Sequence, residues 1–249
     1  MSKRTRALIP CLLAFVTGPL AAPLVWAVDE EDEILFSRTK IIIEFNSSAE
    51  DVGVQVFLDG DPWKNVKAFA PNGRRILDVV GRQSLGQQGL TELFFESSEP
   101  SLAELPLEQF LARFPEGEYE FEGVTIEGEE VEGEATFTHV IPAGPEILSP
   151  DVSGDDPPVV DPDDLVIAWE AVTETITGSE EIEIAGYQVI VEQVEPRRTF
   201  SIDLPAGATG VPVPPGFLVQ RDTLHKFEVL AIEAGGNQTI TEGEFVTAP

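Results

Sequence analysis

Apolar and polar residues alternate along most of the chain from Lys40 onward, and the alternation is clearest in two stretches. Residues 119–127 read YEFEGVTIE, and residues 225–233 read HKFEVLAIE. A period of two places successive side chains on opposite faces of a strand, so each stretch begins as a half-buried strand. After a turn, each is followed by a similar tail, EGEATF at 132–137 and EGEFVT at 242–247. The repeat predicts two similar all-β domains, each closed by a β-hairpin.

In the first of these domains, one segment changes from the period of a strand to that of a helix. Its apolar residues are spaced i, i+3, i+4 and i+7, and Pro106 suits the first position of a helix. We therefore expect a short amphipathic helix over about 106–114, with its apolar stripe on the core, and a polar loop at 81–89. The helix stripe consists of Leu107, Phe110, Leu111 and Phe114. The expected strands are 40–45, 52–58, 63–69, 75–80, 91–95, one beginning at 119, and 134–141.

Proline and glycine mark the boundary between the two domains. Residues 142–145 read PAGP, a short and stiff segment that lies between the two repeats. The expected strands of the second domain are 165–169, 185–192, 199–204, 210–213, 225–233 and 239–247. The predicted organisation is a signal peptide (1–27), an acidic lead-in (28–39), a first domain (40–141), a linker (142–145) and a second domain (145–249).

The second domain begins with PEILSP at 145–150, has Trp169 in its second predicted strand, and has GYQVIV at 186–191 in its third. Leu218 and the run FEVLAIEAGGN at 227–237 follow. Together these residues resemble a fibronectin type III domain, and the resemblance covers about 145–249. The resemblance implies a seven-stranded Greek-key sandwich.

One position departs from the pattern of that family. The family usually has a tyrosine two residues before the Phe227 position, and its hydroxyl ties a corner of the fold to upstream backbone. Here that residue is His225, a ring nitrogen of which could make the same bond. The first domain keeps the tyrosine, as Tyr119 in PEGEYEF, and resembles a divergent immunoglobulin-like or fibronectin-like sandwich. The residues expected to be structural are Tyr119, Phe121, Trp169, Tyr187, His225 and Phe227. The predicted fold class is all-β: two tandem Greek-key β-sandwiches, immunoglobulin-like or fibronectin type III-like, the first with one short inserted helix.

The N-terminus has the pattern of a secretory signal peptide. Basic residues at 3, 4 and 6 precede an apolar run, and VWA at 25–27 comes just before the acidic DEEDE at 29–33. Cleavage near Ala27 predicts a secreted or periplasmic protein; an uncleaved anchor is the alternative, opposed by Pro19 and Pro23. Cys11 is the only cysteine, so the mature chain has no disulfide. No later apolar run reaches the ~18 residues of a membrane span, so we expect none in the mature chain.

Acidic residues outnumber basic ones, 45 to 15, and the net charge is −30. This charge repels nucleic acid and anionic lipid, so we expect no nucleic-acid partner. The charge can alternatively serve solubility alone. Residues 63–89 reverse it, with five cations against Asp78. They can be an edge protected against aggregation, or a patch that contacts an unknown protein, the acidic second domain, a second copy or an anionic surface polymer. The predicted interaction patch is Trp63, Lys64, Lys67, Arg74, Arg75 and Arg82.

Loop aspartates are the one candidate for a metal site, and no other cofactor is expected. Carboxylate oxygens are the ligands that Ca²⁺ prefers, but these loops match no calcium-loop template, and solvated acidic turns are the alternative. The calcium candidates are Asp59, Asp61, Asp155, Asp156, Asp161, Asp163 and Asp164.

No catalytic motif stands out. His139 and His225 are the only histidines, no zinc-binding spacing exists, and GRQSLG at 81–86 is not a nucleophile elbow. We therefore expect a non-enzymatic binding, adhesion or scaffold protein. Two alternatives stay open: a carbohydrate-active or hydrolytic enzyme or accessory protein that uses surface carboxylates, and a fibre or pilus subunit that exchanges an edge strand. Within 28–39 only Ile34–Phe36 could be such a strand. Asn46 and Asn237 lie in glycosylation acceptor sequences.

Overall fold

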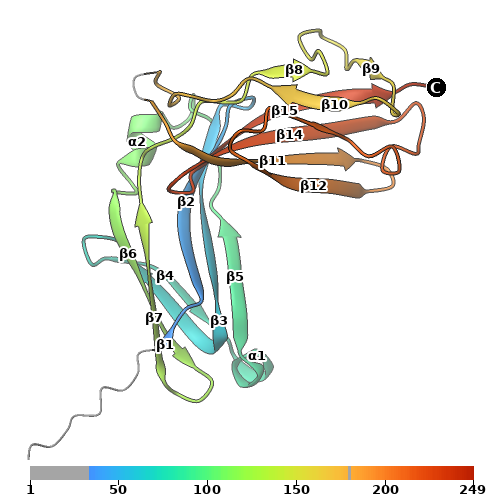
Figure 1. The fold of residues 1–249 in the computed structure, drawn as a ribbon. Coiled ribbons are helices and arrows are strands. Elements are labelled where there is room, and N and C mark those ends of the chain that lie inside the picture. The colour runs from blue at the N-terminus through green and yellow to red at the C-terminus, as the bar shows by residue number, and fades with distance from the viewer. Residues whose placement is uncertain (1–33, 179–180) are drawn as a thin grey trace, which may run out of the picture. The chain divides into compact units, whose positions relative to one another are not determined.

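Strands form most of the regular structure, as the alternating sequence predicts. The computed structural model describes residues 34–178 and 181–249, which belong to one compact unit, Glu33–Pro249. The predicted signal peptide, with Cys11, and residues 28–33 lie outside the described residues. The fold is all-β, with the strands arranged as two sandwiches (Figure 1).

The first sandwich is built around one long strand, β3. Residues 51–59 of β3 pair with β2, and 55–59 also pair with β5. Residues 65–69 pair with β6 on one side and β4 on the other, and the sheet continues from β6 to β7 and β1. The strands are β1 (Ile34–Leu35), β2 (Arg38–Asn46), β3 (Asp51–Phe69), β4 (Arg75–Val80), β5 (Leu90–Glu96), β6 (Gly117–Thr125) and β7 (Glu130–Phe137).

Strand β3 corrects one expectation. The sequence predicts two strands with a turn at 59–62, whereas the structure has a single strand of 19 residues. Its pairing shifts between Asp59 and Trp63, where the strand leaves one set of partners for another. At Gly60 a Cβ would lie 2.9 Å from Cδ1 of Phe36, so the missing side chain lets the strand pass close to that ring. The residues DGDP at 59–62 therefore mark the point where β3 changes its partner strands.

The lead-in is also more ordered than the sequence predicts. Residues 34–35 form β1, which pairs in parallel with β7. Phe36 is only 7% exposed and belongs to the first core, and β2 already begins at Arg38. The apolar Ile34–Phe36 run thus pairs and packs within its own chain.

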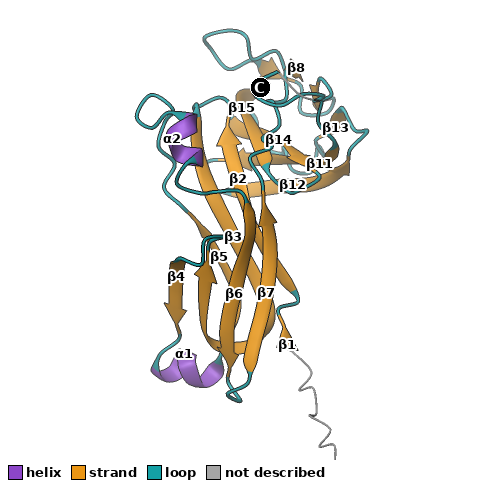
Figure 2. Ribbon diagram, turned by 90° about the vertical axis from the view of Figure 1, so that its left-hand side faces the viewer, coloured by secondary structure: helices purple, strands orange, loops and turns teal. Residues whose placement is uncertain are grey.

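The first sandwich carries two helices where the sequence predicts one. Helix α2 (Leu107–Leu111) is shorter than expected, and its Phe110 is buried in the core. Helix α1 (Gln83–Gln88) replaces the predicted loop; none of its residues is buried, so no apolar period could reveal it. The two helices lie at opposite ends of the sandwich (Figure 2). Among the described residues, no helix has the length and apolar character needed to cross a membrane.

The second sandwich places three strands opposite four. One sheet has the order β13–β10–β8, and the other runs β12–β11–β14–β15, with β9 pairing in parallel with β15. This strand order supports a fibronectin type III-like fold. The strands are β8 (Ile147–Ser149), β9 (Val159–Val160), β10 (Val166–Trp169), β11 (Ile184–Gln193), β12 (Arg198–Pro205), β13 (Gly210–Pro212), β14 (Leu224–Glu233) and β15 (Gln238–Thr247).

Each sandwich encloses its own cluster of buried apolar side chains. The first includes Tyr119 and Phe121 from β6, and the second includes Trp169, Tyr187 and Phe227. The rings of Trp169 and Tyr187 lie 5.3 Å apart between the two sheets. Fully burying a side chain of this size contributes about 1.5–3 kcal/mol, so these clusters dominate the stability of each sandwich.

Candidate functional site at the junction of the sandwiches

A short parallel β-ladder joins the two sandwiches. Residues Gln238–Ile240 of β15 pair with Glu44–Asn46 of β2. The N–H of Ser47 extends the ladder by donating to the carbonyl of Ile240 at 2.8 Å. Because of this pairing, one sheet runs through both sandwiches. Backbone hydrogen bonds, and not only surface contact, therefore hold the junction.

The side chain of Asn237 inserts into this junction from the β14–β15 turn. Its Oδ1 accepts the backbone N–H of Ile43 at 2.8 Å. Its Nδ2 donates to the carbonyls of Thr138, at 3.1 Å, and Val140, at 2.8 Å. Asn237 is 2% exposed. A single buried amide thus bonds to two separate segments of the first sandwich.

The predicted linker is bonded on both of its sides. Thr239 Oγ1 donates to the carbonyl of Pro142, and Pro142 forms an antiparallel bridge with Thr175. Next to it, the N–H of Ile176 donates to the carbonyl of Ile141 at 3.0 Å. The chain between the sandwiches is therefore fixed by its neighbours, beyond the stiffness that its prolines supply.

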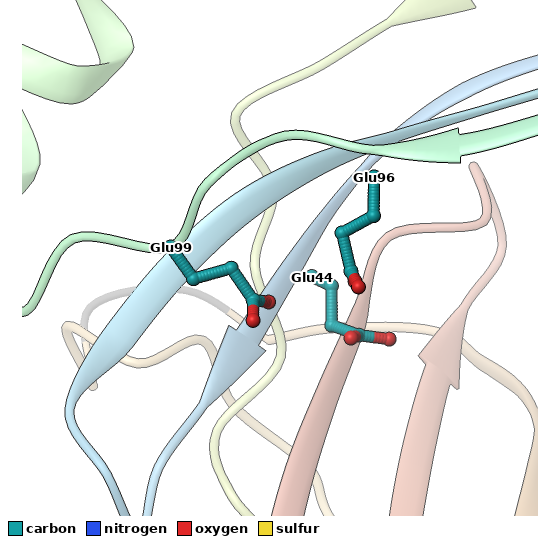
Figure 3. A group of neighbouring side chains, drawn as sticks. All are labelled: Glu44, Glu96 and Glu99. Carbon is teal, nitrogen blue, oxygen red and sulfur yellow. The ribbon is translucent and has the colours of Figure 1, made fainter.

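Three glutamates gather at the same junction: Glu44 of β2, Glu96 at the end of β5, and Glu99 just after it (Figure 3). One carboxylate oxygen from each lies within 4.8 Å of the others. Glu44 is 8% exposed, and its Oε2 accepts a hydrogen bond from Nε2 of Gln238. Within the described part of the chain, no lysine or arginine forms an ion pair with any of the three. The group is a set of uncompensated carboxylates.

The electrostatics of the group favour a proton on Glu44. Burial raises the pKa of Glu44 to about 7; the bond from Gln238 opposes this, while a hydrogen bond to Glu96 and the charges of Glu96 and Glu99 add to it. Burial also raises the pKa of Glu99, helped by the charges of Glu96 and Asp51. A carboxyl kept neutral can donate a hydrogen bond to a neighbouring carboxylate.

No motif or spacing in the sequence points to this group. Glu44 lies in the predicted strand 40–45, and Glu96 and Glu99 follow the predicted strand 91–95. Their oxygens are of the kind that could hold a divalent cation, although Ca²⁺ takes about six to eight such ligands. The negative charges of Asp51 and Glu242 also act on Glu99.

The predicted calcium candidates are not brought together. Asp59 and Asp61 lie within β3, and Asp163 contacts Arg221 at 3.7 Å while its N–H donates to Asp161 Oδ1. Over 34–178 and 181–249, the convergence of three ligand atoms found at Glu44 does not occur among these aspartates. The aspartates are spread along a strand of one sandwich and loops of the other, and calcium binding by any of them stays a prediction.

The structure divides the predicted interaction patch. Arg74, Arg75 and Arg82 are exposed at the outer edge of the first sandwich, whereas Lys64 and Lys67 are half-buried. Arg75 pairs with Asp78 at 3.1 Å. Lys67 lies opposite Asp78 on β4 and Glu122 on β6.

Trp63 cannot belong to a surface patch. Its side chain is 0% exposed and lies in the first core. The register of β3 shifts between Trp63 and Asn65, so Trp63 is buried together with Val66 and Ala68 although Val66 lies three positions after Trp63. Its position beside Lys64 in the sequence hid this, because neighbouring residues of a strand face opposite sides.

The two corner residues make different bonds. The hydroxyl of Tyr119 donates to the carbonyl of Pro115 at 3.0 Å. Nδ1 of His225 lies 3.0 Å from the carbonyl of Thr223, whereas its buried Nε2 has no partner in the described structure. The His225 ring stacks on Phe245, with centroids 5.0 Å apart. Burial lowers the pKa of His225, against the effect of its bond to Thr223.

The glycosylation acceptor sequences are engaged in internal bonds. Asn237 is buried, as described above, and Nδ2 of Asn46 donates to Glu242 Oε1 at 2.9 Å. A glycan on Asn237 would require its amide to leave the junction. The Asn237 side chain that a glycan would need is thus already bonded within the junction.

No family model matches the chain, and no curated protein matches it. Among solved structures, it is similar to the chicken CNTN1 FN1–FN3 domains (12% identity, 87% of this chain and 68% of that chain, TM-score 0.32). It is also similar to a two-domain fibronectin type III segment of chicken tenascin (8%, 84% and 98%, TM-score 0.29). A third is a tetra-tandem repeat from the extending region of a large adhesion protein (11%, 83% and 50%, TM-score 0.28).

Proposed function

We propose that the protein is an exported, non-enzymatic binding or scaffold protein, and that the free edge of β4 is its contact with an acidic partner. The observation that carries the proposal is the chemistry of that edge. Strand β4 pairs only with β3 in the described structure, so its other side offers unpaired backbone groups. Extended segments bind to such edges by adding a strand.

The side chains along this edge suit an acidic, extended segment with apolar residues. Ile76, Val80 and Leu85 of α1 are 48%, 47% and 56% exposed. Arg74 and Arg75 precede Ile76, and Arg82 lies between Val80 and Leu85, in a chain that is otherwise strongly acidic. Charge complementarity favours an acidic partner and repels a basic one.

A role other than catalysis is supported by the two histidines. His225 is buried, and Nε2 of His139 lies 2.7 Å from the carbonyl of Phe114. Both rings are therefore engaged with backbone. A pilus-type strand exchange is less well supported, because Ile34–Leu35 already pairs with β7 of its own chain.

The test is affinity capture from the extracytoplasmic fraction with residues 28–249, beside two charge-reversed variants. The first is R74E/R75E/R82E. The second, R113E/R197E/R198E, reverses three exposed cations elsewhere and changes the net charge equally. We expect the first variant, and not the second, to lose the captured partner. A labelled peptide of alternating glutamate and valine should likewise bind the wild type and the second variant more tightly than the first variant. Equal capture by all three proteins would refute the proposal; an anionic polysaccharide bound in place of the peptide would redirect it to a surface polymer.

A further inference from the structure

The junction between the sandwiches contains a buried carboxyl that its own surroundings do not neutralise. Glu44 stands opposite Gln238 in the three-residue ladder and also bonds to its side chain. Any change in the charge of Glu44 therefore acts directly on the backbone pairing that joins β2 to β15. Glu44 has no role in the contact proposed for β4.

Negative groups approach Glu44 from several elements. Strand β5 and the segment after it supply Glu96 and Glu99, whose oxygens are within 4.8 Å. Gln55 of β3 donates from Nε2 to Glu96 at 2.8 Å and lies 3.4 Å from Gln238. Other titratable groups around the junction are Asp51 of β3, Glu242 of β15, Lys40 of β2, which packs beside Gly236, and the buried Glu233 of β14, which accepts the N–H of Asn237 at 2.9 Å.

We propose that the junction is a proton-dependent latch: it is closed while Glu44 carries a proton, and ionisation of Glu44 loosens the ladder between β2 and β15. A protonated Glu44 can donate to Glu96 while it accepts from Gln238, so its polar atoms are satisfied. An ionised Glu44 is a buried negative charge close to the exposed carboxylates of Glu96 and Glu99, and it has lost the proton that it shares with Glu96.

The direction of the effect follows from linkage. Burial and neighbouring carboxylates raise the pKa of Glu44 from 4.5 to about 7, so the closed junction holds the proton more tightly than an open one. The stabilisation is complete below about pH 4.5 and is lost as the pH rises through about 7. The latch therefore loosens toward alkaline pH.

Two backbone amides report on the latch. The N–H of Ile43 donates to Asn237, and that of Ser47 donates to Ile240. Hydrogen exchange of both is measured on residues 28–249 in EDTA at a series of pH values between pH 5 and pH 8, and each rate is divided by its intrinsic rate at that pH. Val189, buried in the second core, serves as the internal reference. We expect the protection of Ile43 and Ser47 to fall by more than about tenfold, the factor that corresponds to one pKa unit, while that of Val189 stays constant.

Three variants separate the latch from a general effect of pH. Glu44→Gln keeps the shape and cannot ionise, so its protection should be the same at both pH values. Glu118→Gln removes an exposed carboxylate of β6 and should behave as the wild type. Glu96→Gln removes the neighbouring charge, so the pH at which protection is lost should move down. The proposal is overturned if the wild-type amides keep their protection at pH 8, if Glu44→Gln loses it as the wild type does, or if Glu96→Gln leaves the midpoint in place.

Discussion

The junction depends most on the side-chain amide of Asn237, and the substitution Asn237→Ala tests this dependence directly. The substitution removes the acceptor of the Ile43 N–H and both donors to the carbonyls of Thr138 and Val140. Asn237 is buried, so water does not reach these groups without some opening of the junction. The change leaves the cores of the two sandwiches intact.

The expected loss follows from the groups left without partners. A buried donor without an acceptor costs about 1–3 kcal/mol, and each lost bond to a carbonyl removes a further contribution of about 1 kcal/mol. We therefore expect Asn237→Ala to lower the free energy of unfolding by about 3–5 kcal/mol. In a chain of this size, that corresponds to a melting temperature lower by about 6–20 °C.

The measurement is thermal unfolding of residues 28–249, followed by circular dichroism and calorimetry. Asn72→Ala is the matched control, because the exposed Asn72 makes one turn bond, accepting the N–H of Arg74 at 3.0 Å. The control should change the free energy of unfolding by less than about 0.5 kcal/mol. If Asn237→Ala melts within the error of Asn72→Ala, the junction bonds do not stabilise the fold and the reasoning is wrong.

Two further predictions concern the second sandwich. Gly243→Ala should destabilise it by about 1–3 kcal/mol in urea unfolding, because the new Cβ would lie 2.4 Å from Cζ of the buried Phe227. NMR titration should give His225 a pKa below 6.5, since its ring is buried and charging it is unfavourable. By linkage, His225 then lowers the stability as the pH falls below 6.5, where the unfolded chain binds the proton more readily.

Each of these two has a clear failing result. Gly207→Ala is the control for the first, because nothing lies within 4 Å of a Cβ at Gly207; equal stability of the two alanine variants would show that the Phe227 ring moves aside freely. For the second, a His225 pKa at or above 6.5 would mean that the ring is hydrated in solution.

Most of the fold could be predicted from local patterns. Strands with one face buried alternate in sequence, so β6 and β14, which begin at Gly117 and Leu224, agree closely with the predicted elements. Helix α1 could not be predicted, because an element without buried residues carries no apolar period. The burial of Trp63 was missed because the turn residues before it imply a surface, whereas β3 continues through them.

The candidate site divides in the same way. The exposed cations of β4 follow from a local reversal of charge, which can be read from the chain. The contacts of the junction cannot be read from the chain. Glu44 and Gln238 are 194 residues apart, and no local pattern around Asn237 predicts that its amide binds backbone groups of the other sandwich.

The sequence by itself determined the strand content, the repeated hairpin and the acidic charge, because these follow from the order of residues within each element. Only the tertiary structure decided that β2 pairs with β15, that Asn237 fills the space between them, and that Glu44 is buried among carboxylates. These features depend on which surfaces pack together, and the local sequence of one element does not determine its packing partner.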